Sequence, residues 1–241
     1  MAKSFFIRIR FYLFNIILCI FFMSCTTTQI EITEPGDPWE RSNRSVHSFN
    51  SSLDDWFLKP VAETYDFVTP NFIQTGISNI FSNIGSISSS LNNLFQGKLV
   101  GFSTELSRVV INSTLGIYGL FDVASQFGIE PDREDLGQTF GYWGVSSGPY
   151  MVVPFYGPTT VRDFSSILPE IYISPSIPDD VSARLAAASL NVINIRSSLL
   201  NVSDLSGNDQ YSFYRDAYLQ RREYEISDGK LDESLFEDDF D

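Results

Sequence analysis

The sequence predicts a mainly α-helical protein whose helices alternate with irregular segments rich in glycine and proline. Apolar residues recur at steps of three and four, the spacing of one helix face, in the segments 46–56, 73–95 and 181–202. Strand patterns are scarce, and only Tyr150–Val153 has one. The chain has 241 residues and no internal repeat, so we expect one domain with short appendages.

The beginning of the chain has the features of an export signal. Basic residues come first, and an apolar run of 13 residues follows that is too short to span a bilayer. The run ends at Ser24-Cys25, which resembles a bacterial lipobox, so we expect residues 1–24 to be cleaved and Cys25 to carry the lipid anchor. Phe22 stands where leucine is usual, which leaves an uncleaved signal anchor as the alternative. The basic residues are Lys3, Arg8 and Arg10.

Cysteine usage and the residues after the anchor agree with an exported lipoprotein. The only other cysteine, Cys19, lies inside the signal peptide, so the mature chain can form no internal disulfide. Thr26 follows Cys25 where aspartate would favour the inner membrane, and we therefore expect the outer membrane. Residues 25–38 form a polar tether.

The first helical pattern follows the tether. Its apolar positions are Val46, Phe49, Leu53 and Trp56. We expect this helix to end at Lys59-Pro60, because residues before a proline avoid the α region.

Residues 71–97 carry no charge and form an unusual helical pattern. Apolar residues follow one face closely, and the opposite face holds only Ser, Asn and Gln, including Asn79, Asn83 and Asn93. A helix on a water-exposed surface normally carries charged residues there. The neutral polar face indicates contact either with buried protein or with a confined aqueous lumen, and the sequence leaves both open.

An acidic loop follows a second charge-poor helical region at 102–128. Glu130, Asp132, Glu134 and Asp135 offer oxygen ligands for calcium, but their spacing is not that of an EF-hand. We expect a solvated loop.

Leu136–Val161 contains no charged side chain over 26 residues. Five glycines and three prolines interrupt it, and these residues cost a helix about 1 and 3 kcal/mol each relative to alanine. We therefore expect irregular backbone, not one continuous helix. Irregular backbone rich in aromatic residues occurs in an ordinary core, or at membrane depth where protein or a polar cavity covers it.

The C-terminal part alternates helices with breaks. A short segment starts at Arg162-Asp163 and should end near Pro169, and residues 181–202 form the most regular amphipathic pattern. Residues 228–241 hold seven acidic side chains and one lysine, which is typical of a solvated tail. A last helix before this tail carries Tyr211, Tyr214 and Tyr218.

Several function classes are excluded or disfavoured. The net charge of −14 and the lack of a basic stripe argue against nucleic acid. The segment 144–148 matches the G-x-S-x-G nucleophile elbow, which needs a strand before it and a helix after it within an alternating strand–helix pattern. The sequence lacks that pattern, and its only histidine, His47, lies upstream and not downstream. One histidine without a second histidine or a mature thiol cannot build a zinc site. We expect no catalytic residues, no metal site and no cofactor.

Distinctive short blocks run through the chain from Asp37 to Gly229. The densest series lies between Gly137 and Asp163, with GQTFG, WG, GPY and GP in that order. Together the blocks resemble the MlaA (VacJ) family of lipoproteins, with residues 39–227 as the helical domain. Ser146-Ser147 depart from the family, in which proline is common before the glycine at 148. The other blocks are DPWER at 37–41, FN at 49–50, KPV at 59–61, GISN at 76–79, FSN at 81–83, LFQGK at 94–98, INSTLG at 111–116, GLFD at 119–122 and AYLQRR at 217–222.

This resemblance implies a ring-like arrangement of amphipathic helices embedded in the periplasmic half of the outer membrane of a Gram-negative bacterium. A polar channel through the ring would pass mislocalised outer-leaflet phospholipids to a periplasmic carrier of the Mla type, which serves an inner-membrane ABC transporter. Family members also lie against trimeric porins.

Under this hypothesis the glycine-rich segment forms the channel rim and the polar helix face contributes to the lining. The predicted rim residues are Gly141, Gly144, Gly148, Pro149 and Tyr150, and the predicted lining residues are Asn79, Asn83 and Asn93. An ordinary turn is the alternative role for each glycine. The alternative function is an envelope scaffold that binds a porin without moving lipid, and a lipid-modifying enzyme is a third, less favoured class.

Overall fold

The computed structural model describes residues 37–175, 178, 180–200 and 209–230. The chain divides into two compact units, Met1–Pro38 and Trp39–Asp241, and all elements named below belong to the second. The predicted signal peptide, Cys25 and most of the tether lie outside the described residues, as does the acidic tail beyond Lys230.

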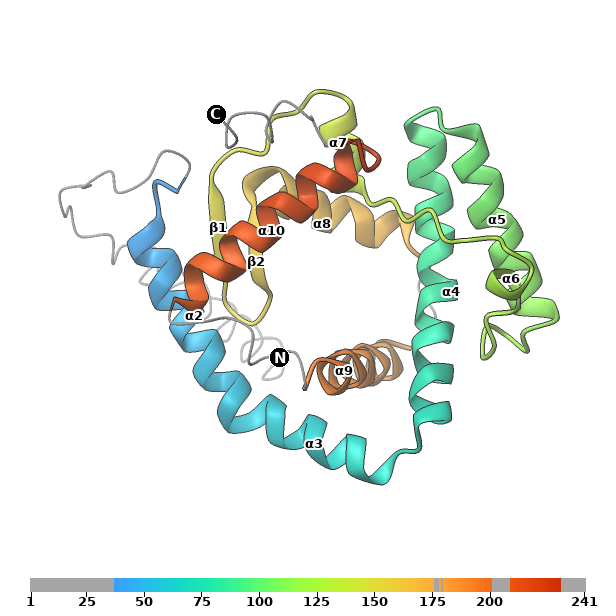
Figure 1. Cartoon of the computed structure of the whole chain (residues 1–241), viewed down its shortest axis with the longest axis horizontal. Helices are drawn as coiled ribbons and strands as arrows, with labels where there is room; N and C mark the ends of the chain where they lie inside the picture. Colours follow the sequence, from blue (N-terminus) through green and yellow to red (C-terminus); the bar gives the residue numbers. More distant parts are fainter. Residues whose placement is uncertain (1–36, 176–177, 179, 201–208, 231–241) are drawn as a thin grey trace, which may run out of the picture. The chain divides into compact units, whose positions relative to one another are not determined.

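Helices make up most of the second unit, which confirms the prediction of a mainly α-helical protein (Figure 1). Two short strands form an antiparallel hairpin in which Tyr150 pairs with Thr160 and Val153 with Gly157. The predicted strand is confirmed, whereas its Gly-Pro-containing partner shows no strand pattern in the sequence. The elements are α2 (Glu40–Leu53), the π-helical turn η1 (Asp54–Leu58), α3 (Lys59–Val68), α4 (Asn71–Phe95), α5 (Leu99–Thr114), α6 (Val123–Gln126), α7 (Leu136–Tyr142), β1 (Tyr150–Val153), β2 (Gly157–Thr160), α8 (Val161–Ile173), α9 (Val181–Ser198) and α10 (Gln210–Ile226).

The first helical segment does not end at Lys59-Pro60, so that prediction was wrong. α2 continues through η1 into α3, and Pro60 lies in the first turn of α3. A proline inside an α-helix lacks a donor and its ring clashes with the carbonyl four residues earlier. The wider π-turn changes the bonding just before the proline, because the Lys59 N–H bonds to the Asp54 carbonyl five residues back. The proline is accepted without ending the helix.

α8 also extends beyond its predicted end, since Pro169 lies inside it and the helix reaches Ile173. Glu170, the residue after Pro169, makes long-range contacts that stabilise the last turn of α8. The Glu170 carboxylate accepts hydrogen bonds from the Leu136 N–H at 3.0 Å and from the Ser88 hydroxyl. These contacts tie α8 to α7 and α4 and offset the bond that the proline cannot make.

The charge-free stretch 136–161 is not one helix, which confirms the prediction from its glycines and prolines. It opens with α7, and Asp135 caps this helix by accepting from the Gln138 N–H. The helix ends in a Schellman motif, in which the N–H groups of Val145 and Gly144 bond to the Phe140 and Gly141 carbonyls, both at 2.9 Å. Gly144 has φ of +88°, a conformation that favours glycine.

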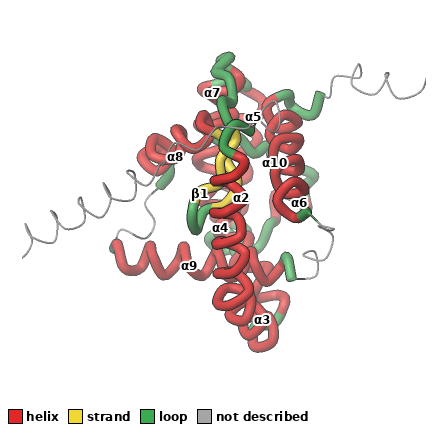
Figure 2. Tube along the Cα trace, turned by 90° about the vertical axis from the view of Figure 1, so that its left-hand side faces the viewer, coloured by secondary structure: helices red, strands yellow, loops and turns green. Residues whose placement is uncertain are grey.

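Within the second unit the elements touch one another in a closed sequence (Figure 1). η1 and α3 follow α2, and α4 contacts both α7 and α8. α8 contacts β2, and β1 returns to α2. α9 packs on α3 and α4, whereas α10 packs on α7 and β2. In the side view of Figure 2, α8 and α9 extend to the same side of β1.

Candidate functional site

The distribution of polar and apolar side chains is inverted relative to a water-soluble domain. Few hydrophobic side chains are buried, while large ones are exposed, such as Trp56 at 81%, Phe67 at 91% and Tyr118 at 85%. An apolar surface of this extent marks contact with a membrane or another protein. The buried hydrophobic residues among those described are Ala62, Ala124, Leu136, Tyr150, Val152 and Tyr211.

The neutral polar face of α4 is directed towards protein. Asn79 donates to the Leu120 carbonyl at 3.1 Å, and Asn83 donates to the Ser113 hydroxyl at 2.9 Å. Asn93, which is fully buried, donates to the Ser89 and Asp132 carbonyls at 3.2 and 3.0 Å. These asparagines connect α4 to the region between α5 and α7, and their place in a channel stays a prediction.

The predicted rim residues lie in one region but in different surroundings. Gly141 lies in α7. A Cβ at this position would lie only 2.9 Å from the Ile226 side chain, so the glycine allows the end of α10 to approach α7. Gly144 faces open space, and Gly148 has φ of +65° beside Val161. The Pro149 carbonyl accepts from the N–H of Val161.

Tyr150 differs from the other predicted rim residues because it is buried, with 2% of its surface exposed. Its ring packs against Tyr211 and Tyr218 of α10, with centroids 6.2 and 6.1 Å apart. In this structure it is part of the small core. A role at a channel rim stays a prediction for Tyr150, as it does for Gly141, Gly144, Gly148 and Pro149.

Two asparagines join α2 to the edge of β1, and the sequence analysis names only the second of them, Asn50, as part of a block. Asn43 donates to the Tyr150 carbonyl at 3.1 Å and accepts from the Val152 N–H at 3.0 Å. Asn50, two turns later, donates to the Val153 carbonyl at 3.0 Å and accepts from the Phe155 N–H at 2.9 Å. Each side-chain amide pairs with the hairpin as a neighbouring strand would, and this closes the sequence of contacts.

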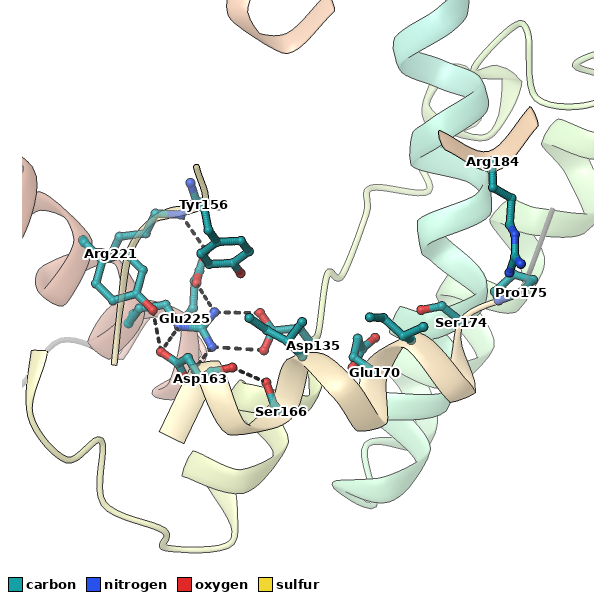
Figure 3. A pocket seen from close by; sticks show the side chains of 14 residues that line it. Asp135, Tyr156, Asp163, Ser166, Glu170, Ser174, Pro175, Arg184, Arg221 and Glu225 are labelled. Carbon is teal, nitrogen blue, oxygen red and sulfur yellow. Dashed lines mark hydrogen bonds and ion pairs between the residues drawn. The ribbon is translucent and has the colours of Figure 1, made fainter. Parts of the chain in front are cut away.

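A cavity of about 510 Å³ lies between α8, α10 and the start of α9 (Figure 3). Charged groups and apolar side chains both line it, including Arg184, Arg221, Ile167 and Ile171. Arg184 makes no ion pair with a described residue, and the Arg221 side chain is 77% exposed with Glu225 at 2.7 Å. The lining also includes Arg222 and the carboxylates of Asp135, Asp163, Glu170 and Glu225, so the cavity presents charges of both signs beside apolar surface.

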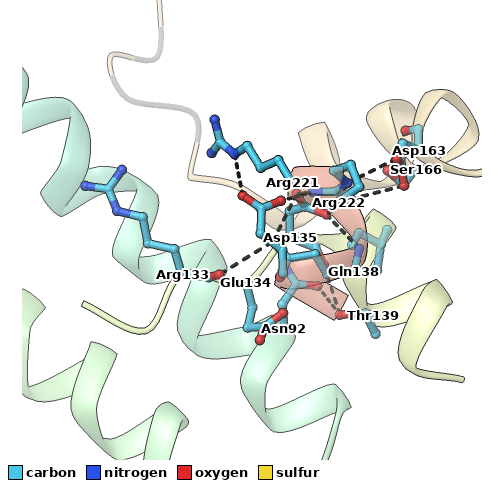
Figure 4. Close-up of polar contacts among 12 residues, drawn as sticks. Asn92, Arg133, Glu134, Asp135, Gln138, Thr139, Asp163, Ser166, Arg221 and Arg222 are labelled. Carbon is cyan, nitrogen blue, oxygen red and sulfur yellow. Dashed lines mark hydrogen bonds and ion pairs between the residues drawn. The ribbon is translucent and has the colours of Figure 1, made fainter. Parts of the chain in front are cut away.

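Arg222 forms the centre of an ion-pair network at one wall of this cavity (Figure 4). Its guanidinium lies 2.7 Å from Asp135, 3.1 Å from Asp163 and 2.9 Å from Glu225. The network joins the N-cap of α7, the first turn of α8 and the C-terminal end of α10. One arginine thus holds three elements together.

Asp163 receives further bonds that keep it ionised. Tyr218 donates to it at 2.7 Å, and Arg162 donates at 2.9 Å. Burial would raise the pKa of Asp163, but the bonds from Arg162 and Tyr218 and the charge of Arg222 hold this pKa below its ordinary value. Burial and the neighbouring carboxylate both raise the pKa of the Tyr218 hydroxyl.

A second ion pair, between the buried Arg108 and the half-buried Asp122 at 2.9 Å, holds the segment between α5 and α7. This pair predicts a dependence of stability on pH. Burial would raise the pKa of Asp122, but hydrogen bonds from Ser125, Asn112 and Arg108 lower it to about 2 from a value of 3.8. Because the folded-state pKa is depressed, this stabilisation is complete above about pH 4 and is lost as the pH falls towards 2.

We expect Asp122→Asn to have a shallower fall of melting temperature between about pH 5 and 2 than the parent protein. Asp55→Asn changes an exposed carboxylate in η1 and should keep the parent slope. Thermal unfolding followed by circular dichroism measures both, and equal slopes for the parent and Asp122→Asn would contradict the assignment.

Ser146 lies in an exposed loop after α7 and before β1. A nucleophile elbow requires a strand before the serine and a helix after it, which is the reverse order. The structure thus agrees with the rejection of this motif from the sequence.

None of the described helices combines the length and the apolar character needed to cross a membrane.

Comparison with known proteins identifies the family. The model of the MlaA lipoprotein family matches residues 35–225. A protein of Rickettsia typhi is 35% identical over 176 residues, which is 67% of this chain and 70% of that protein. The "Intermembrane phospholipid transport system lipoprotein MlaA" of Haemophilus influenzae is 30% identical over 213 residues, which is 85% of this chain and 84% of that protein.

A solved structure agrees with these relatives. It is described as the "Structural basis for maintenance of bacterial outer membrane lipid asymmetry", and it matches with a TM-score of 0.71 and 31% sequence identity. The match covers 80% of this chain and 100% of the other. The arrangement of helices and hairpin, the family model and these identities together place the chain in the MlaA lipoprotein family.

Proposed function

We propose that this protein transports phospholipids between the membranes of a Gram-negative envelope and so maintains the lipid asymmetry of the outer membrane. The observation that carries this proposal is the inverted polarity, in which a cavity with charged walls lies within a domain whose large hydrophobic side chains are exposed. A lipid needs both environments at once. Its headgroup requires polar surroundings, and its acyl chains require apolar ones.

The cavity suits a phospholipid headgroup without any covalent step. Arg184 and Arg221 reach it from α9 and α10, and a guanidinium binds phosphate oxygens through charge-assisted hydrogen bonds. Ile167 and Ile171 of α8 supply apolar surface for the start of the acyl chains. Binding and release are then sufficient for transport, which agrees with the expectation of a protein that is not an enzyme.

We place the helices as a ring in the periplasmic half of the outer membrane, anchored by acylated Cys25. The exposed aromatic and aliphatic residues support contact with acyl chains. The proposed rim consists of Gly141 near the end of α7 and of the following loop with Gly144, Gly148 and Pro149. Gly144 and Gly148 are exposed and the space beside Gly144 is open, which supports this assignment. A periplasmic carrier of the Mla type, its inner-membrane ABC transporter and a trimeric porin are the proposed partners.

An envelope scaffold that binds a porin without moving lipid is the second candidate function. Exposed Trp56, Phe67 and Tyr118 favour it, because aromatic residues are enriched in protein–protein interfaces. The two functions differ in one observable, which is phospholipid held by the purified protein.

Mass spectrometry of the detergent-extracted protein, produced in a Gram-negative host, tests this proposal. We expect an N-terminus at acylated Cys25 and phospholipid in near-stoichiometric amount. We expect Arg184→Glu to reduce the bound phospholipid several-fold, because a carboxylate would repel the phosphate. Arg41→Glu makes the same charge change on an exposed arginine of α2 outside the cavity and serves as the control.

The outcomes separate the candidates. Acylation without bound lipid in the parent protein would favour the scaffold. A chain that keeps residues 1–24 would contradict the proposed anchor. Equal lipid content in both arginine variants and the parent would remove Arg184 from the headgroup site.

A further inference from the structure

The region where the acidic loop before α7 meets α4 and α5 contains two buried oxygen atoms, Asn93 Oδ1 and Glu105 Oε2, that have no hydrogen-bond partner among the described residues. It is separate from the lipid cavity, which lies at α8, α9 and α10. Three side chains bring oxygen atoms to this region: Asn93 from α4, Glu105 from α5 and Asp132 from the loop. Asn93 and Glu105 are both fully buried.

The orientation of the Asn93 amide is fixed by its donors. Its Nδ2 donates to the carbonyls of Ser89 and Asp132, so its Oδ1 must face the other way. That oxygen is buried and has no hydrogen-bond partner among the described residues. Turning the amide over would place its oxygen against two carbonyl oxygens, which is unfavourable.

The unpartnered amide oxygen meets a carboxylate at Gly101. A Cβ at this glycine would overlap Asn93 Oδ1 and Asp132 Oδ2 alike, so the two oxygens border the same small volume. Glu105, one helical turn after Gly101, accepts the Asp132 N–H with one oxygen at 2.5 Å. Its other oxygen, Oε2, is buried and has no partner among the described residues.

No basic side chain neutralises this cluster. Neither Glu105 nor Asp132 forms an ion pair with a residue in the described part of the chain. The terminal nitrogens of Arg108 and the amine of Lys98 bond to other groups, and the buried Nε of Arg108 has no partner among the described residues. Arg108, which follows Glu105 on α5, is bound to Asp122, and Lys98 is bound to Glu134. A buried carboxylate without a partner is strongly unfavourable, so the geometry calls for a cation.

We propose that Asn93, Glu105 and Asp132 bind a hard divalent cation of the calcium type. Carboxylate and amide oxygens are the ligands that calcium prefers, and the exposed position of Asp132 leaves room for water molecules that complete its coordination. No group of three His, Cys, Asp or Glu side chains that could hold a metal occurs among the described residues, and here an amide supplies the third ligand. The bound cation would fasten the acidic loop to α4 and α5.

The expectation of a solvated loop was wrong for two of its four acidic residues, because Glu134 is buried and paired with Lys98, and Asp135 caps α7 and pairs with Arg222. The proposal gives a role to a third, Asp132. The spacing of the acidic residues gave no sign of a site, because only Asp132 of the four takes part. The other two ligands come from helices that precede the loop, and their convergence depends on the packing of α4 against α5.

Thermal unfolding of the full-length protein in detergent tests this site. The protein is first treated with EDTA, and melting temperatures are then compared with and without about 10 mM CaCl₂ at matched ionic strength. With the affinities typical of extracellular calcium modules, we expect a rise of about 3–10 °C. Asp132→Asn and Glu105→Gln should each lose most of this rise.

Glu130→Gln is the matched control, because Glu130 is an exposed carboxylate of the same loop without a contact to the cluster. It should keep the full calcium effect. Asp132 is also exposed, so its variant should fold even if Glu105→Gln does not. No calcium-dependent rise in the parent protein, or an equal rise in Asp132→Asn, would overturn the proposal.

Discussion

Arg222→Ala should destabilise the protein by about 3–5 kcal/mol, the usual effect of removing one partner from a buried ion pair. The Arg222 side chain is 11% exposed and contacts carboxylates from three parts of the chain. Its removal leaves Asp135 without a countercharge and leaves Asp163 with Arg162 alone. The free energy of unfolding, measured with denaturant in a fixed detergent, gives the loss directly.

The neighbouring arginine provides a close control. Arg221 has the same side chain on the same helix, but it is 77% exposed and pairs only with Glu225. Exposed pairs contribute about 0–1 kcal/mol, so Arg221→Ala should be nearly neutral. Arg222→Lys should restore part of the stability, because an ammonium supplies charge without the two parallel bonds to Asp135. Equal losses in both alanine variants would contradict the central role of Arg222.

Asn43→Ala should have the second-largest effect on the free energy of unfolding, because Asn43 joins α2 to the hairpin through two hydrogen bonds. The substitution leaves the Tyr150 carbonyl and the Val152 N–H without their partner in a buried position. Each unsatisfied buried group costs about 1–3 kcal/mol. We expect a corresponding fall in unfolding free energy, and faster hydrogen exchange at the Val152 amide.

Two further variants make this test specific. Asn43→Asp keeps an acceptor for Val152 but places a carboxylate against the Tyr150 carbonyl, so it should be as unfavourable as alanine. Ser45→Ala lies nearby on α2, is exposed, and loses only a bond to the preceding turn. It should change the stability by less than about 0.5 kcal/mol. Slow exchange at Val152 in Asn43→Ala would show that the junction does not depend on this amide.

The sequence was sufficient for the features that depend on local pattern. The spacing of apolar residues predicted α4 and α9, and the glycines and prolines predicted the break-up of residues 136–161. The predictions failed where distant contacts outweigh local preference. Pro60 and Pro169 both lie inside helical segments, and Glu170 shows how contacts to α4 and α7 stabilise a turn that contains a proline.

The site was less accessible to sequence reasoning than the fold. Asp135, Asp163 and Arg222 are far apart in the chain, and no spacing rule relates charges that meet only after folding. Only the blocks that resemble the family pointed to these residues. The densest series of blocks ends at Asp163, and the block AYLQRR ends at Arg222. Similarly, Asn43 pairs with a strand more than a hundred residues away, and an asparagine in an amphipathic helix gives no indication of this.

The π-helical turn between α2 and α3 determines how the helix face that contacts β1 is rotated relative to the face that contacts α9. It adds one residue to a helical path, which rotates everything after it by about 100° relative to an uninterrupted α-helix. Before the turn, Asn43 and Asn50 point to β1, and within it Asp54 forms a two-pronged pair with Arg196 of α9 at 2.7 and 2.8 Å. A chain shortened by one residue at 54–58 would keep the helix yet direct α3 away from α9, so the length of this turn is as constrained as its composition.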